Sequence, residues 1–102
     1  MKIDLKENEV VIKAGDSTQI QHSEKVKGKL ILTNQRIYFK SIINSNNGFN
    51  LEILFNQIRE IIYFSSGMFS PKGIRLITRT GNEMQFTMKD RDKWGMMINK
   101  MY

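Results

Sequence analysis

The clearest alternation of apolar and polar residues lies between Val26 and Lys40. Apolar residues or glycine recur at every second position before a turn at Thr33-Asn34-Gln35, which is typical of a strand with one buried face. Asn34 suits the turn because it tolerates a left-handed backbone. The segment is therefore predicted to be a β-hairpin. Its buried face holds Val26, Gly28, Leu30, Leu32, Ile37 and Phe39, and its opposite face holds the basic residues Lys25, Lys27, Lys29, Arg36 and Lys40.

Further strands are predicted on both sides of this hairpin. Alternation, or enrichment in β-branched and aromatic residues, marks four later segments, and turn residues separate them. The pattern is weaker near the N-terminus, where one or two strands are expected. The later segments are 49–53, 58–64, 74–79 and 83–88, and the earlier ones are 9–13 and 16–21.

The last segment changes its period. Apolar residues recur at i, i+3, i+4 and i+7, which predicts a helix with one apolar stripe formed by Trp94, Met97, Ile98 and Met101. Asp90 or Asp92 is expected to cap its first N–H groups. Gly95 costs a helix about 1 kcal/mol relative to alanine, so a packing reason is expected for it.

The order of elements is thus about seven antiparallel strands followed by one amphipathic helix, a mainly β fold with one C-terminal α-helix. A strongly bent sheet leaves an open end, which a helix carrying Trp94 can close. An OB-fold has five strands and a helix in the middle, so it fits less well. A length of 102 residues predicts a single domain, residues 1–102.

The composition indicates a positive net charge and a reducing compartment. Sixteen Lys and Arg residues against ten Asp and Glu give a net charge of +6, which favours an anionic surface such as nucleic acid or an acidic membrane leaflet. The chain has no cysteine, which favours a reducing compartment. The first residues carry no apolar signal segment, and no run of 18 apolar residues spans a membrane. A cytoplasmic protein is expected, peripheral on the inner face of a membrane if it binds lipid.

The basic residues fall into two rows. One is the face of the hairpin described above; the other consists of Arg75 and Arg79, with Lys72 just before them. Each row is consistent with an ordinary solvated sheet face or with a surface that binds phosphate groups, those of lipid headgroups first and of nucleic acid second. Nucleic acid is disfavoured because no RNA-binding signature accompanies the aromatic residues.

The segment Ser65–Gly73 has the composition of a loop but carries Met68 and Phe69 at its middle. Two interpretations stay open for this pair. The side chains fold back over the end of the barrel, or they are exposed and contact a membrane or a partner protein.

No catalytic, metal or cofactor site is predicted. The only histidine, His22, lies in a polar setting without a nucleophile and is expected to be exposed. Asp90 and Asp92 are explained by capping, and the glycines match no phosphate-binding motif. The chain is therefore predicted not to be an enzyme.

The hairpin sequence Val-Lys-Gly-Lys-Leu-Ile-Leu-Thr-Asn-Gln-Arg-Ile-Tyr-Phe, residues 26–39, resembles the signature G-x-L-x-L-T-N-x-R-x-x-F of GRAM domains. Matching positions extend from about Glu9 to Met101, with Trp94 and Ile98 in the terminal helix. The resemblance implies a pleckstrin-homology-like fold: a bent barrel of two roughly orthogonal antiparallel sheets, with seven strands and a capping helix. It also implies a non-enzymatic module that binds membrane lipids or proteins.

Three functions follow, in order of preference. The first is binding to an anionic membrane surface through Lys25, Lys27, Lys29, Arg36, Lys40, Lys72, Arg75 and Arg79, with Met68 and Phe69 as membrane or partner contacts. The second is protein interaction or self-assembly as a weak homo-oligomer, through a sheet edge or the 65–73 segment. The third is nucleic-acid binding.

Overall fold

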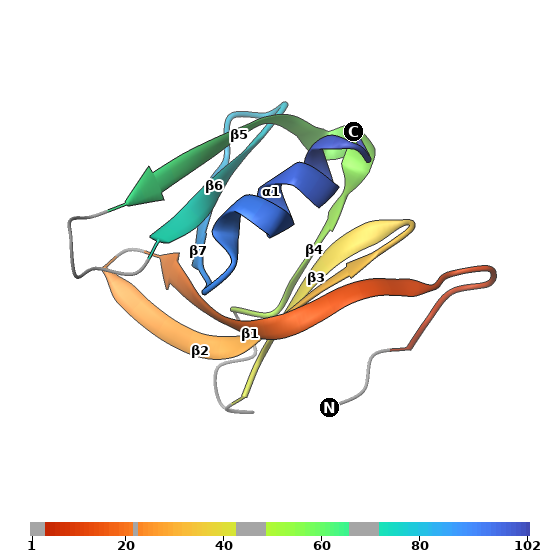
Figure 1. Cartoon of the computed structure of the whole chain (residues 1–102), viewed down its shortest axis with the longest axis horizontal. Helices are drawn as coiled ribbons and strands as arrows, with labels where there is room; N and C mark the ends of the chain where they lie inside the picture. Colours follow the sequence, from red (N-terminus) through yellow and green to blue (C-terminus); the bar gives the residue numbers. More distant parts are fainter. Residues whose placement is uncertain (1–3, 22, 43–48, 66–71) are drawn as a thin grey trace.

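The computed structural model describes residues 4–21, 23–42, 49–65 and 72–102. Within these ranges it contains seven strands, a short 3₁₀ turn at Phe55–Gln57 and one C-terminal helix (Figure 1). The elements are β1 (Val11–Gln21), β2 (Glu24–Thr33), β3 (Arg36–Ser41), β4 (Leu51–Leu54), β5 (Ile58–Ser65), β6 (Lys72–Thr78), β7 (Glu83–Thr87) and α1 (Arg91–Asn99). The predicted mainly β fold with one C-terminal helix is confirmed.

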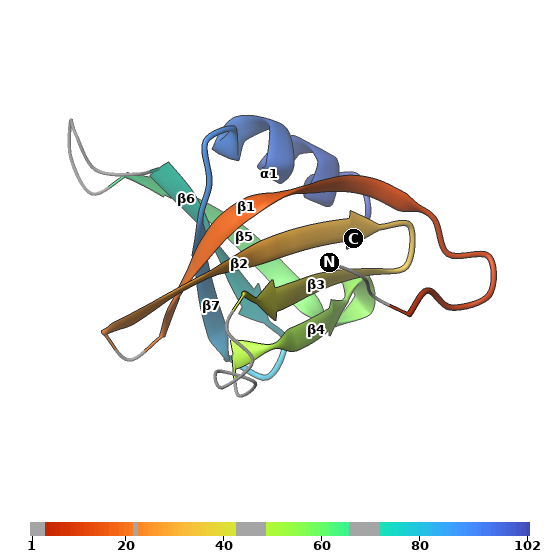
Figure 2. The ribbon, with the colours of Figure 1, turned by 90° about the horizontal axis from the view of Figure 1, so that it is seen from below.

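All seven strands belong to one antiparallel sheet in the order β4-β3-β2-β1-β7-β6-β5. Strand β1 joins its two halves: it pairs with β2 from Val11 to Gln21, and with β7 through residues 18–20. Figure 2 shows strands β1–β4 crossing over β5–β7. The two expected sheets are therefore halves of one hydrogen-bonded sheet that share β1, and the N-terminal region gives one long strand rather than two.

The core lies between the two halves of the sheet and helix α1 (Figure 1). The alternation in the β2–β3 hairpin predicts its inner face correctly, since Leu30, Leu32, Ile37 and Phe39 are fully buried. From the helix, Trp94 and Ile98 complete this core, as the apolar stripe predicts. The rest of the core is formed by Ile53, Ile58, Ile74, Leu76, Phe86 and Met88.

The start of helix α1 is fixed to β1 by charge rather than by a cap. Asp90 occupies the N-cap position, but its side chain makes no capping hydrogen bond. It forms an ion pair with Lys13, with 2.6 Å between Oδ2 and Nζ, and this hydrogen bond lowers the pKa of Asp90. The same Nζ lies 5.3 Å from the centroid of the Trp94 ring. The capping prediction is wrong for Asp90; Asp92 pairs with Arg91.

The structure shows the close packing that is expected at Gly95 from the unfavourable effect of a glycine within a helix. A Cβ built at this position would lie 2.0 Å from Cε1 of Tyr63, so the tyrosine ring of β5 rests directly on the helix backbone. The guanidinium of Arg91 lies 5.4 Å from the centroid of the same ring, and its Nη1 donates to the carbonyl oxygen of Phe64 at 3.0 Å. Gly95 therefore allows helix α1 to approach the edge strand of the sheet.

The N-terminal segment 4–10 is held against the turn between β2 and β3. The Asn34 side chain accepts a hydrogen bond from the backbone N–H of Val10 and donates one to the carbonyl oxygen of Asn8. Gln35 donates through Nε2 to the carbonyl oxygen of Glu7. The Thr-Asn-Gln-Arg run of the hairpin therefore binds the polypeptide that precedes β1.

Arg36 completes this contact through a buried ion pair with Glu9. Its Nε and Nη2 donate to the two carboxylate oxygens of Glu9 at 2.8 and 3.0 Å, and Thr33 Oγ1 donates to the same carboxylate at 2.6 Å. A second pair joins Arg36 to Glu52, and Nη2 also donates to the carbonyl oxygen of Asp4. Only 6% of Arg36 is exposed, so the prediction that it faces solvent with the hairpin lysines is wrong.

Candidate anion-binding site

A cleft of about 570 Å³ opens where β1 and β2 pass the ends of β6 and β7. Three lysines reach it from separate segments: Lys27 from β2, Lys72 from the start of β6 and Lys89 from just beyond β7. We call it the basic cleft. Its other lining residues are Asp16, Ser17, Thr18, Gly28, Ile42, Thr87 and Met88.

Non-local hydrogen bonds bring these lysines together. The backbone N–H of Met88 donates to the carbonyl oxygen of Lys72 at 3.1 Å. Lys89 follows Met88 in the chain and therefore lies close to Lys72. Ser17 Oγ donates to the carbonyl oxygen of Thr87 at 2.8 Å, which fixes β1, and with it Lys27 on the neighbouring strand, to the end of β7. The sheet itself therefore positions the three cations.

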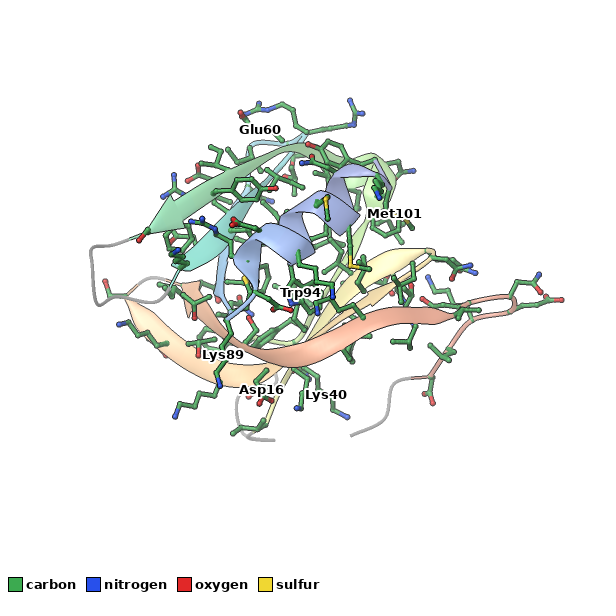
Figure 3. All side chains as sticks on the ribbon, in the orientation of Figure 1. Asp16, Lys40, Glu60, Lys89, Trp94 and Met101 are labelled. Atoms are coloured by element: carbon green, nitrogen blue, oxygen red, sulfur yellow. The ribbon has the colours of Figure 1, made fainter. Side chains whose placement is uncertain are left out.

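The balance of charge in the basic cleft is positive. Asp16 is its one acidic lining residue, and its carboxylate is paired with Lys29, whose hydrogen bond lowers the pKa of Asp16. Among the residues that the structure describes, Lys27, Lys72 and Lys89 form no ion pair. Figure 3 shows Lys89 and Asp16 on the same side of the molecule, below helix α1. Lysine ammonium groups beside threonine hydroxyls are suited to bind a phosphate group.

A smaller hollow of about 300 Å³ adjoins the basic cleft at the start of helix α1 and shares Lys72 and Lys89 with it. It adds Arg91 and Lys93, together with Asp90 and Asp92. Both carboxylates are already engaged, by Lys13 and Arg91 respectively. The positive region around Lys72 and Lys89 therefore extends beyond the cleft.

The structure separates the basic residues that the sequence places in two rows. Lys27 and Lys72 line the basic cleft, whereas Lys29 pairs with Asp16 at its rim and lies opposite Lys40 on β3. The remaining predicted residues lie elsewhere on the described surface: Lys25 is exposed at the start of β2, Arg75 lies in the middle of β6, and Arg79, beyond the far end of β6, donates through Nε to the carbonyl oxygen of Asn56.

Lys89 is the cleft residue that sequence reasoning missed. It follows the last strand in a short polar link, where alternation assigns no face. Its place depends on the pairing of β6 with β7, in which Gly73 lies opposite Thr87. The signal that could have indicated it is its position directly after the predicted strand 83–88, because the neighbouring predicted strand, 74–79, is preceded by another lysine, Lys72.

Three predictions concern residues outside the described ranges. Met68 and Phe69, predicted as membrane or partner contacts, and His22, predicted to be exposed, stay predictions. In the part of the chain that the structure describes, no helix is long and apolar enough to cross a bilayer. The same residues contain no group of three or more His, Asp or Glu side chains arranged to hold a metal ion.

The fold is shared with pleckstrin-homology domains. The C-terminal domain of an unknown protein from Leishmania infantum superimposes with a TM-score of 0.80 at 20% identity, over 93% of this chain and 85% of that one. The N-terminal PH domain of Vps36 gives a TM-score of 0.67 at 18% identity, over 95% and 80%. The PH domain of Slm1, solved in complex with inositol 4-phosphate, gives 0.57 at 11% identity, over 89% and 92%.

These likenesses show that the chain has a pleckstrin-homology-like fold. Within it the chain belongs to the GRAM domain family, whose model matches residues 1–102. The comparison with curated proteins gives no match.

Proposed function

We propose that this GRAM domain is a non-enzymatic module that binds an anionic membrane surface, with the phosphate of a lipid headgroup held in the basic cleft. The observation that carries the proposal is the convergence of Lys27, Lys72 and Lys89 on one cleft without ion-paired partners among the described residues. A neighbour of the same fold, the PH domain of Slm1, is solved with a phosphorylated inositol, which supports this chemistry.

The expected attachment is weak and reversible. A basic residue near an anionic leaflet contributes about 1 kcal/mol, so three lysines supply roughly 3 kcal/mol before the cost of association. We propose that Met68 and Phe69 add apolar contact at the same membrane, and that the protein acts in the cytoplasm on the inner face. Binding should weaken with salt, because exposed charges are screened over about 10 Å at 0.1 M ionic strength.

The variant Lys72→Gln with Lys89→Gln tests the basic cleft. In co-sedimentation with vesicles of phosphatidylcholine containing phosphatidylserine or phosphatidylinositol phosphate, its affinity is expected to fall about tenfold or more relative to the parent, since two charges worth about 1 kcal/mol each are lost. Binding to pure phosphatidylcholine vesicles should be negligible for both proteins.

The matched control is Arg59→Gln with Lys100→Gln, which removes the same net charge from exposed positions outside the cleft. It should lose much less affinity. Equal losses in the two variants would mean that net charge, not the cleft, causes binding, and equal negligible binding of the parent to all vesicles would refute lipid binding itself. Met68→Ser with Phe69→Ser, in the same assay, is expected to weaken binding without lowering the melting temperature.

A further inference from the structure

The side of the sheet that faces away from the core carries two rows of directly paired residues across five strands. Because Ile74, Leu76 and Phe86 point into the core, their neighbours on β6 and β7 point to the opposite side. We call this surface the outer face. Its rows, from β2 to β5, are Lys25, Ile20, Gln85, Arg75 and Ile62, and then Lys27, Thr18, Thr87, Gly73 and Phe64.

The outer face is basic and bears no carboxylate. Three of its ten residues are cations and none is acidic. Acidic residues lie in the adjacent rows: Glu60 and Glu83, both paired with Ile77, on one side, and Asp16, paired with Lys29, on the other. Figure 3 shows Glu60 directed away from helix α1. An anionic partner would therefore meet attraction on these two rows and repulsion just beyond them.

The outer face is also more apolar than a solvated sheet face needs to be. Ile20, Ile62 and Phe64 are half-buried there, and the polar side of an antiparallel sheet usually carries polar residues at such positions. The Phe64 ring lies across Gly73, since a Cβ at that glycine would be 2.7 Å from Cζ of Phe64. The ring thereby covers the backbone and presents a flat apolar area beside Arg75.

Arg75 stands at the centre of the outer face with an unused donor. Its Nε is buried and has no hydrogen-bond partner. A buried donor without an acceptor is unfavourable, and native proteins contain few of them, so such a group calls for an explanation. The charge and planar geometry of a guanidinium fit a carboxylate.

We propose that the outer face binds an acidic segment of a partner protein, with a carboxylate bound by the guanidinium of Arg75 and apolar side chains packing on Ile20, Ile62 and Phe64. Half-buried apolar side chains between cations on a sheet face fit a polypeptide better than a bilayer, which is entered by projecting side chains. The surface is distinct from the basic cleft, apart from three residues at their common border, and it gives the predicted protein-interaction function a specific location.

The distance between two cations of the outer face sets the spacing of carboxylates in the proposed acidic segment. Arg75 and Lys25 are separated by three strand-to-strand steps of about 4.8 Å each, or roughly 14 Å. An extended peptide advances about 3.4 Å per residue, so carboxylates at positions i and i+4 can reach both cations. The residue at i+2 then lies about 7 Å from each cation, between Gln85 and Ile20, where an apolar side chain can pack on Ile20.

A synthetic peptide of this pattern, acetyl-Leu-Glu-Thr-Val-Thr-Glu-Ser-amide, is the probe. Titrated into the whole ¹⁵N-labelled chain, it is expected to shift the amide resonances of β6, β7 and the second half of β1. Arg75→Met should weaken binding roughly tenfold, as expected for one charge-assisted hydrogen bond, without lowering the melting temperature, because it removes an unsatisfied donor. Replacing both glutamates of the peptide by glutamine should have at least as large an effect.

Arg59→Met is the matched control, since Arg59 is exposed on β5 outside the outer face, and its effect should stay below about twofold. The proposal is overturned if millimolar peptide shifts no outer-face resonance, or if Arg75→Met leaves peptide affinity unchanged. It is equally overturned if Arg75→Met weakens vesicle binding and not peptide binding, since the outer face would then meet a membrane. Lys72→Gln with Lys89→Gln should spare peptide binding, so failure of lipid binding and failure of this proposal are distinguishable.

Discussion

Replacing Glu9 by alanine is expected to lower the free energy of unfolding by about 3–5 kcal/mol, the usual cost of removing one partner of a buried ion pair. The Glu9 side chain has no exposed surface, and both of its oxygens accept from Arg36. Without it the guanidinium keeps one ionic partner, Glu52, whose side chain is 38% exposed, and the carbonyl oxygen of Asp4. Small domains are stable by about 5–15 kcal/mol in total, so this loss is severe. Urea unfolding monitored by circular dichroism measures it.

Two comparisons isolate the cause of that loss. Glu7→Ala removes an exposed carboxylate from the same segment, and its effect should stay within about 0.5 kcal/mol. The double variant Glu9→Ala with Arg36→Met removes both charges and should be more stable than Glu9→Ala alone, because no buried cation is left unpaired. If the double variant lost as much free energy of unfolding as Glu9→Ala and Arg36→Met lose together as single variants, this account would be contradicted.

The same ion pair should make stability depend on pH. Hydrogen bonds from Arg36, opposed by burial, lower the pKa of Glu9 from 4.5 to about 2. Between these values the unfolded chain binds a proton that the folded chain does not, so the contribution of Glu9 is complete above about pH 4.5 and is lost as the pH falls through 2. Unfolding experiments from neutral pH to about pH 3 should show a decline that is smaller in Glu9→Ala with Arg36→Met.

The strands and the helix could be predicted because their alternation reports a local property, the face on which each side chain lies. Arg36 shows the limit of that reasoning. Alternation assigns it correctly to the outer side of β3, but exposure there depends on what covers the sheet, and the segment 4–10 lies over this end of the hairpin. Nothing in the spacing of the hairpin residues indicates that a preceding segment returns to it.

The candidate site depends even more than the burial of Arg36 on the pairing of segments that are distant in the sequence. The sequence places Lys72 in a row with Arg75 and Arg79, yet Arg79 lies beyond the opposite end of β6, roughly 23 Å away for seven residues at 3.3 Å each. Its true neighbour is Lys89, which the β6–β7 register brings beside it. A sequence pattern can find basic strands, but only the register of the sheet decides which cations share a cleft.

Gly28→Ala is the second change expected to have a large effect, a loss of about 3 kcal/mol or more in the free energy of unfolding, at the upper end for overpacking. A Cβ at Gly28 would lie 2.3 Å from the carbonyl oxygen of Lys40 and 2.7 Å from Cζ of Phe39. The first contact is with the backbone of the paired strand, and the second is with a fully buried ring. Neither can move without separating β2 from β3 or disturbing the core.

Gly15→Ala provides a control with the same chemical change. A Cβ at Gly15 meets only Cζ2 of Trp94 at 3.7 Å, an ordinary van der Waals contact. Alanine should therefore be tolerated there, with a gain of about 0.5 kcal/mol from the reduced freedom of the unfolded chain. If Gly28→Ala unfolded at the same urea concentration as Gly15→Ala, the close approach of β2 and β3 would be wrong. The backbone of Gly28 has no positive φ, so its conformation does not require a glycine. The expected result would therefore show that the glycine of the family signature is needed because the neighbouring strand leaves no room for a Cβ.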